Sequence, residues 1–233
     1  MRCIAVEAAT GSGARLSASQ CIDVETLSQR IRYNLMIGAI VPRPIAVVGT
    51  ISPTGFHNLA PFSFFNGVGS EPMLLSFCPA NRVDGLPKDT LRNALPPEEG
   101  GTGCFTVNIA GHRILPQVVA SADELDFGMS EFAAVGLTPI TGTRVIAPRV
   151  REAPIAFECV THAVHRFAEG KPGGANIVIG RVVAVHYPEG LADSRMHIDP
   201  ARLDAVGRMG ADIYCTTRDR FALDRPSVTR EPS

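Results

Sequence analysis

The chain has 233 residues, of which 45% are hydrophobic and 19% are charged, and its formal net charge is −1. This composition suits a soluble globular protein with a substantial core rather than a disordered or fibrous chain. Because the sequence has no basic stripe with interleaved aromatic residues, nucleic acid is not an expected partner, and because its apolar stretches fall well short of the roughly 20 residues of a bilayer span, neither is a membrane.

The first segment, residues 1–22, is rich in Ala, Ser and Gly and has weak periodicity. These features predict a flexible N-terminal arm outside the core. The arm lacks the continuous apolar stretch of a signal peptide, and the six cysteines are scattered without a C-x-x-C pair. We therefore expect a cytoplasmic protein with free thiols, in which residues 23–233 form one domain because no linker divides them.

The remaining chain predicts a mainly β protein, a β-barrel with short helices. Asp23 is a suitable N-cap for a helix that runs to Met36, and Gly38 is a suitable end. From Ile40 onward the sequence consists of runs rich in β-branched residues, separated by Pro and Gly. These runs predict strands over residues 45–51, 74–77, 105–109, 155–164 and 177–186. Turn signals stand at residues 52–55 and 170–174, the second joining two long runs as a hairpin. Short helices are predicted over residues 89–95, 111–120 and 130–134.

The first segment that could carry chemistry is Val41-Pro42-Arg43-Pro44-Ile45-Ala46. The two prolines hold the backbone around Arg43 in extended geometry, as at an edge strand that enters a barrel. Arg43 is thus held in a stiff frame, where it either contacts a ligand or pairs with a surface carboxylate.

The second segment, Asn58-Leu59-Ala60-Pro61-Phe62-Ser63-Phe64-Phe65-Asn66, crowds three aromatic residues among Ser and Asn. Such a segment can place an apolar wall against a planar ring while amide and hydroxyl groups satisfy the ring's polar edge. The alternative is that the phenylalanines simply fill the core.

The third segment, Lys88-Asp89-Thr90-Leu91-Arg92-Asn93, is predicted to open a helix with its own capping residue. Free backbone N–H groups together with Lys88, Thr90 and Arg92 could hold a phosphate there. An ordinary capped surface helix is the alternative.

Several familiar site motifs are missing from the sequence. No G-x-G-x-x-G follows a predicted strand, and no P-loop, H-E-x-x-H or G-x-S-x-G motif occurs. The histidines and cysteines do not cluster at metal-ligand spacing, so no metal site is expected. Any nucleotide must therefore be bound without Rossmann or P-loop geometry.

Together and in this order, the three segments resemble the flavin reductase-like family with the FMN-binding split barrel, whose members carry P-R-P-I-A, N-L-A-P-F-S-x-F-x and K-D-T-x-x-N. The likeness continues through Glu131-Phe132, residues 136–139, 153–159 and 179–186, and residues 221–226. It covers about residues 24–226. The arm and a loop at residues 96–101 lie outside the shared pattern.

The resemblance implies a six-stranded split barrel that forms a homodimer, with FMN in a groove at the subunit interface. Matching positions imply that the flavin is lined by Arg43, Pro44, Ile45, Ala46, Thr50 and Ser52. The same matching assigns contacts with the isoalloxazine ring to Asn58, Ala60, Pro61, Phe62, Ser63 and Phe64. The resemblance assigns the phosphate contacts to Lys88, Asp89 and Thr90. Asn93, which ends their motif, is also counted among the FMN-binding residues.

The resemblance also implies an oxidoreductase, and we expect an NAD(P)H-dependent flavin reductase that passes electrons to free flavin, another acceptor, a monooxygenase or a redox protein. No protein acid or base is required, because the cofactor carries the hydride chemistry. The alternative is a flavoredoxin-like electron carrier with tightly bound FMN that a protein partner reduces. A hydrolase that uses Ser63 or a cysteine lacks a recognisable base and orienting group.

Overall fold

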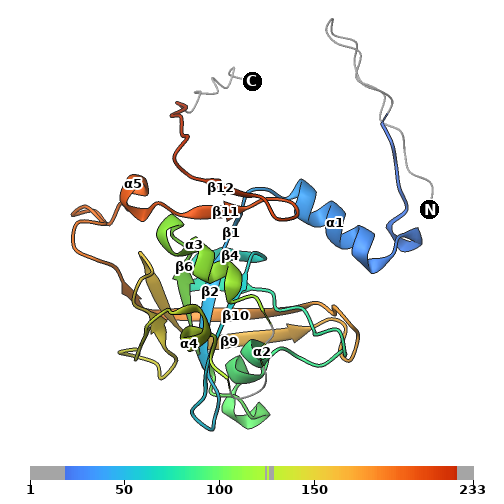
Figure 1. Cartoon of the computed structure of the whole chain (residues 1–233), viewed down its shortest axis with the longest axis horizontal. Coiled ribbons are helices and arrows are strands. Elements are labelled where there is room, and N and C mark those ends of the chain that lie inside the picture. Colours follow the sequence, from blue (N-terminus) through green and yellow to red (C-terminus); the bar gives the residue numbers. More distant parts are fainter. Residues whose placement is uncertain (1–18, 124, 126–128, 225–233) are drawn as a thin grey trace, which may run out of the picture.

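The protein is built around one antiparallel sheet of seven strands (Figure 1), seen in a computed structural model that describes residues 19–123, 125 and 129–224. The strand order is β3-β2-β6-β9-β10-β5-β4. The strands are β2 (Ala46–Ile51), β3 (His57–Phe62), β4 (Phe65–Ser70), β5 (Met73–Phe77), β6 (Cys104–Ile109), β9 (Ala156–Arg166) and β10 (Asn176–His186). The predicted mainly β fold is confirmed.

The ends of this sheet meet, because its two edge strands are consecutive in the chain. β3 and β4 stand at opposite ends of the strand order, yet only Ser63 and Phe64 separate them. The sheet must therefore curl until the strands at its ends lie next to this corner. We expected six strands; the described sheet has seven because the chain leaves β2 at Phe62 and pairs with β5 from Phe65 onward.

The smaller elements surround the curled sheet. A second sheet contains β1 (Arg43–Pro44), β11 (Val206–Arg208) and β12 (Tyr214–Thr216), and a third pairs β7 (Pro139–Ile140) with β8 (Arg149–Val150). The helices are α2 (Asp89–Ala94), α3 (Leu115–Ala120), α4 (Glu131–Val135) and α5 (Pro200–Leu203), with 3-10 turns η2 (Pro97–Glu99) and η3 (His112–Ile114). The predicted hairpin is confirmed, since β9 and β10 pair from Arg166↔Asn176 onward.

The first helix differs from the prediction at both ends. Asp23 caps only a 3-10 turn, η1 (Val24–Thr26), through the Glu25 amide. Leu27 is extended, and Ser28 then caps α1 (Gln29–Ala39) by accepting a hydrogen bond from the Ile31 amide. Two N-cap residues stand close together in the sequence, and the chain uses both. Gly38 lies inside the helix rather than ending it.

The core lies on both faces of β2. One cluster, inside the curled sheet, contains Phe62, Phe77 and Phe105, whose rings pack with centroid distances of 5.2 and 5.1 Å. The other cluster lies between the outer face and the helices, and Val47 of β2 belongs to it together with Phe132 of α4. Because both faces of β2 are packed against core residues, the position of this strand is rigidly fixed.

Two segments extend away from the sheet (Figure 1): α1 and the chain that follows β12. On α1, the side chains of Ile31, Tyr33, Leu35 and Met36 are each 48% exposed. Phe221, beyond β12, is 88% exposed. These apolar side chains lie uncovered in the single subunit.

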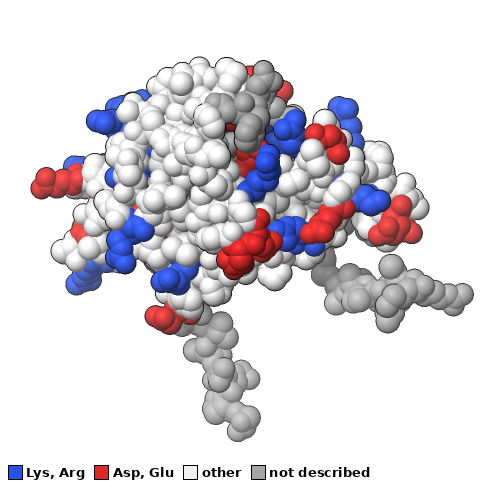
Figure 2. Space-filling model, turned by 90° about the horizontal axis from the view of Figure 1, so that it is seen from below, with Lys and Arg blue, Asp and Glu red and all other residues white. Residues whose placement is uncertain are grey.

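The charged residues on the face shown in Figure 2 include both signs, interspersed around a largely uncharged middle. In the described part of the chain, no helix is long and apolar enough to cross a membrane. Among the same residues, no group of three or more His, Cys, Asp or Glu side chains could hold a metal ion.

Candidate flavin-binding site

The predicted site residues converge only in part, on a small groove between β3, α2 and the chain after α3. Five of them line it: Asn58, Ala60, Lys88, Asp89 and Thr90. Segments that are about 30 residues apart in the sequence are thus brought together. The groove has a volume of about 50 Å³ within one subunit.

A chain of hydrogen bonds fixes the two walls of this groove to each other. The Asn58 amide nitrogen donates to the hydroxyls of Thr50 and Thr90, at 3.2 and 3.0 Å. The Asn93 amide nitrogen donates to the same Thr50 hydroxyl at 3.1 Å. β2, β3 and α2 are thereby joined through side chains, and α2 is held in register with Asn58.

The same hydrogen bonds divide the predicted residues into two groups. Thr50, Thr90 and Asn93 are 0, 1 and 6% exposed, and their polar atoms are bonded to one another or to Asn58. They position the groove, whereas Asn58, Lys88 and Asp89 are partly exposed at its surface. Arg92, which was predicted to donate to the phosphate, instead donates to the Asp89 carboxylate at 3.1 Å and is paired within α2.

Two details, one at the start of α2 and one at the turn between β2 and β3, were not predicted. Lys88 occupies the N-cap position, but its side chain makes no capping hydrogen bond. Ser52 does not line the groove; its hydroxyl accepts a hydrogen bond from the Phe56 amide at 3.0 Å and closes the turn between β2 and β3. The turn itself is as predicted, with Gly55 at φ +91°.

Arg43 is buried, with 3% of its surface exposed, and each of its three guanidinium nitrogens has a hydrogen-bond partner within the protein. It donates to the carbonyls of Ile37 and Ile40 at the end of α1, to the carbonyl of Met209, and to the hydroxyl of Ser63 at 3.2 Å. No carboxylate is among these partners, so the alternative of a surface ion pair is wrong. Arg43 ties α1 and the β11–β12 connection to the β3–β4 corner.

The aromatic segment is divided between core and surface. Phe62 is 9% exposed and packs on Phe77 in the inner cluster, whereas Ser63 and Phe64 are half-buried at the corner. The Phe64 ring lies 6.3 Å from that of Tyr33 on α1. Among the other predicted residues, Ile45 and Ala46 are buried, Pro61 is half-buried and Pro44 is exposed.

Glu131, at the start of α4, lines the groove and was absent from our predicted site. Its carboxylate accepts a hydrogen bond from the Leu59 amide at 2.9 Å, on the side of β3 that no strand covers. Burial raises the pKa of Glu131, the hydrogen bond from Leu59 lowers it, and the nearby charge of Asp89 raises it; the pKa lies above its usual value overall. The motif that contains Glu131 belongs to the family resemblance, which was the available signal.

Comparison with known proteins identifies the family. The sequence model of the flavin reductase like domain matches residues 37–203. The chain belongs to the flavin reductase-like family. This match includes all three predicted segments and both walls of the groove.

Solved structures of other flavin reductase-like proteins share the fold. Nitrilotriacetate monooxygenase component B from Bacillus cereus is 32% identical, with a TM-score of 0.81 over 89% of this chain and 100% of the other. The 2-nitrobenzoate 2-nitroreductase NbaA from Pseudomonas fluorescens is 33% identical, with a TM-score of 0.76 over 92 and 99% of the two chains. A flavin reductase with a split barrel domain from Shewanella frigidimarina has a TM-score of 0.73 at 25% identity, over 87 and 96%.

These relatives establish the split barrel and a flavin-related oxidoreductase role for the flavin reductase-like chain. The conclusion agrees with the local chemistry of the groove. Its lining combines two cationic groups, from Arg82 and Lys88, with the Asn58 amide and three carboxylates, from Asp89, Asp123 and Glu131. Such a set can bind a phosphate on one side and sugar hydroxyls on the other.

Proposed function

We propose that this protein binds FMN noncovalently in a homodimer and reduces it with NADH or NADPH. The observation that carries the proposal is the convergence of Asn58, Ala60, Lys88, Asp89 and Thr90 on one groove. These residues come from two separate motifs of the sequence, each of them weak evidence alone. Their meeting at one surface favours a shared ligand over unrelated structural roles.

The proposed FMN contacts are divided between the groove and the β3–β4 corner. Lys88 holds the phosphate by charge, while Asn58 and the neighbouring backbone of β3 contact the ribityl chain and the ring edge. Bound FMN would supply the hydride chemistry. The corner at Ser63 and Phe64 supports the ring, and Arg43 acts by fixing the Ser63 hydroxyl rather than by contact with the flavin.

The size of the groove supports the homodimer. A volume of about 50 Å³ in one subunit is far below the roughly 300 Å³ at which ligand pockets begin, so a second copy would have to complete the site. The exposed apolar side chains of α1 and of the chain after β12 offer a surface for that copy. Light scattering of the purified protein tests this: a monomer at micromolar concentration would contradict it.

The sharpest test of the FMN site compares Lys88 with Lys171, which lies in the exposed β9–β10 loop. Replacing Lys88 with alanine removes a charged contact and should weaken FMN binding about 10- to 100-fold. Lys171→Ala should leave it unchanged. Riboflavin lacks the phosphate, so its affinity should be similar in all three proteins. Equal effects of Lys88→Ala on FMN and riboflavin would place the phosphate elsewhere.

The electron donor is tested separately, by adding NADH or NADPH to the FMN-loaded protein without oxygen and following the flavin absorbance. Bleaching by either nicotinamide supports the reductase. Stoichiometric, non-exchanging FMN that neither nicotinamide bleaches would favour the electron carrier. Bacillus cereus component B is by name part of a monooxygenase, and we propose such an enzyme as one possible consumer of the reduced flavin.

We also propose that residues 23–233 act as one domain, that residues 1–22 form an arm, and that the protein works in the cytoplasm. Cys21, Cys78, Cys104, Cys159 and Cys215 are free thiols, which supports a reducing compartment. Most of the arm, residues 1–18, lies outside the described part of the chain.

A further inference from the structure

A second, much larger cleft lies at the other end of the sheet, with a volume of about 1150 Å³. Its walls are the end of β10, the connection between β8 and β9, the turn η3 and the helix α5. Asn108, Ala156 and His186 are neighbours at this end of β6, β9 and β10. α2 and the flavin groove lie toward the opposite end, where the Thr161 hydroxyl of β9 donates to the carbonyl of Ala94. The two sites share no lining residue.

One end of the cleft is organised by Glu158, which is completely buried behind the wall. Its carboxylate accepts hydrogen bonds from the amides of Thr143, Arg144 and Val145 and is bonded to the His186 ring nitrogen Nε2 at 2.5 Å. Burial alone would raise the pKa of Glu158, but these hydrogen bonds lower it to about 2. The ionised carboxylate therefore fixes His186 at the cleft wall.

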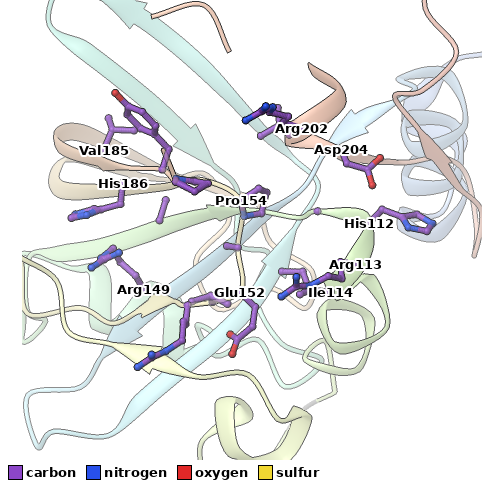
Figure 3. Close-up of a pocket in the computed structure, with 18 of the residues that line it drawn as sticks. His112, Arg113, Ile114, Arg149, Glu152, Pro154, Val185, His186, Arg202 and Asp204 are labelled. Atoms are coloured by element: carbon purple, nitrogen blue, oxygen red, sulfur yellow. The ribbon is translucent and has the colours of Figure 1, made fainter. Parts of the chain in front are cut away.

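The same carboxylate holds Arg149 beside His186 (Figure 3). The Arg149 Nε lies 3.6 Å from a Glu158 oxygen, too far for a hydrogen bond, and is buried without a hydrogen-bond partner among the described residues. Glu158 is already saturated by other donors. Arg149 is thus ion-paired with Glu158 but makes no hydrogen bond with the described residues, so its guanidinium donors are unused.

Two of the carboxylates that line the cleft are already engaged. Asp204 forms a two-pronged ion pair with Arg218, at 2.8 Å for both bonds, and Glu152 accepts a hydrogen bond from the Thr138 amide at 3.0 Å. Both pKa values are lowered: that of Asp204 chiefly by the hydrogen bond from Arg218, and that of Glu152 by its hydrogen bonds to Thr138, which outweigh burial. The third, Glu189, is exposed. Neither Asp204 nor Glu152 is bonded to Arg113 or Arg149 among the described residues, so these two guanidinium groups keep donors for a ligand.

The opposite end of the cleft adds a second such cation. Arg113, next to Ile114 and His112 (Figure 3), is exposed and makes no hydrogen bond or ion pair with any residue in the described ranges. Pro154 lies between the two ends, and Val185 adds further apolar surface. The cleft therefore presents guanidinium groups at both ends of a partly apolar wall.

We infer that this cleft binds a small organic polyanion of nucleotide size, recognised through its phosphate or carboxylate groups by Arg113 and Arg149. Guanidinium groups with free donors match the planar oxygen pairs of either anion. The volume of about 1150 Å³ slightly exceeds the roughly 300–1,000 Å³ of most small-molecule sites. The inference does not depend on flavin binding.

The test is calorimetric titration of the full-length protein with ADP, citrate and uncharged adenosine. ADP, citrate or both should bind, more weakly as salt is raised, because charge carries recognition. ADP alone would identify phosphate as the anion and citrate alone would identify carboxylate. Arg113→Gln should weaken binding about tenfold. Arg195→Gln, a change of another exposed arginine outside the cleft, should have no effect.

Several results would overturn the inference. Adenosine binding as tightly as ADP would show that charge is not recognised, and no heat with ADP or citrate at millimolar concentration would show that no such site exists. Equal behaviour of Arg113→Gln and Arg195→Gln would exclude the cleft. Loss of ADP binding in Lys88→Ala, with Arg113→Gln unaffected, would place ADP in the flavin groove. Since Arg113 is exposed, its variant should retain the wild-type melting temperature, and this is checked first.

Discussion

Replacing Thr50 with valine should break the hydrogen bonds that join the walls of the flavin groove. Thr50 is fully buried, and its hydroxyl accepts hydrogen bonds from Asn58 and Asn93. Valine keeps the branched shape of threonine but replaces the hydroxyl, which is both donor and acceptor, with a methyl group. Asn58 retains its bond to Thr90, but the Asn93 amide nitrogen has no other hydrogen-bond partner within the described ranges.

The expected loss follows from these contacts. An orphaned buried donor at Asn93 costs about 1–3 kcal/mol, and the weakened bond at Asn58 adds about 1 kcal/mol. Thr50→Val should therefore lower the free energy of unfolding by about 2–4 kcal/mol. Thr50→Ser keeps the hydroxyl and loses one buried methyl group, for about 1 kcal/mol.

The measurement is urea unfolding of the variants at one fixed protein concentration, because subunit association would also contribute to stability. The double variant Thr50→Val/Asn93→Leu removes donor and acceptor together and should be more stable than the sum of the two single changes predicts. If Thr50→Val and Thr50→Ser lose the same free energy, the methyl group matters and the hydrogen-bond argument fails.

Three further outcomes follow from charged side chains that are buried or half-buried. In Arg43→Lys, the ammonium group cannot satisfy three carbonyls and the Ser63 hydroxyl at once. Proteolysis within α1 should therefore accelerate at least several-fold. An unchanged cleavage rate would show that Arg43 does not hold α1 in place. Glu158 has its pKa lowered to about 2 from 4.5, so it contributes about 3 kcal/mol above pH 5 that is lost as the pH falls toward 2. The unfolding free energies of wild type and Glu158→Gln should converge over that window, and a constant difference would contradict this. Glu131→Gln removes a negative charge beside the proposed phosphate site while an amide oxygen can still accept from Leu59. FMN affinity should rise about 2- to 5-fold at pH 8 and match wild type in acid, where Glu131 is protonated.

Local signals in the sequence were sufficient where neighbouring residues decide the structure. The turn at Ser52–Gly55 and the β9–β10 hairpin were predicted because Pro and Gly restrict the backbone wherever they stand. The helix start was wrong because Asp23 and Ser28 are both good caps. Local chemistry does not say that the chain bends between them at Leu27.

The site was predicted in part, for a related reason. Asn58 and Lys88 were recognised by type and order, but the sequence did not show that Thr50, Thr90 and Asn93 would bond to one another or to Asn58. Partners this far apart are set by the packing of three elements. The anion cleft was missed entirely, since its walls come from four segments between residues 111 and 204, and the family patterns within them do not show that these segments meet.

The β3–β4 corner connects these observations, because it closes the sheet and is tied to α1 through Arg43. Ser63 accepts from Arg43, and Arg43 also holds the last turn of α1 through Ile37 and Ile40. α1 carries the exposed apolar side chains expected to meet a second subunit. A change in the position of α1 must therefore move or break the bond to Ser63, whose segment is proposed to support the flavin ring. On this reasoning, subunit association and flavin affinity are coupled, and binding of FMN should strengthen the dimer by the same factor by which the dimer strengthens binding of FMN.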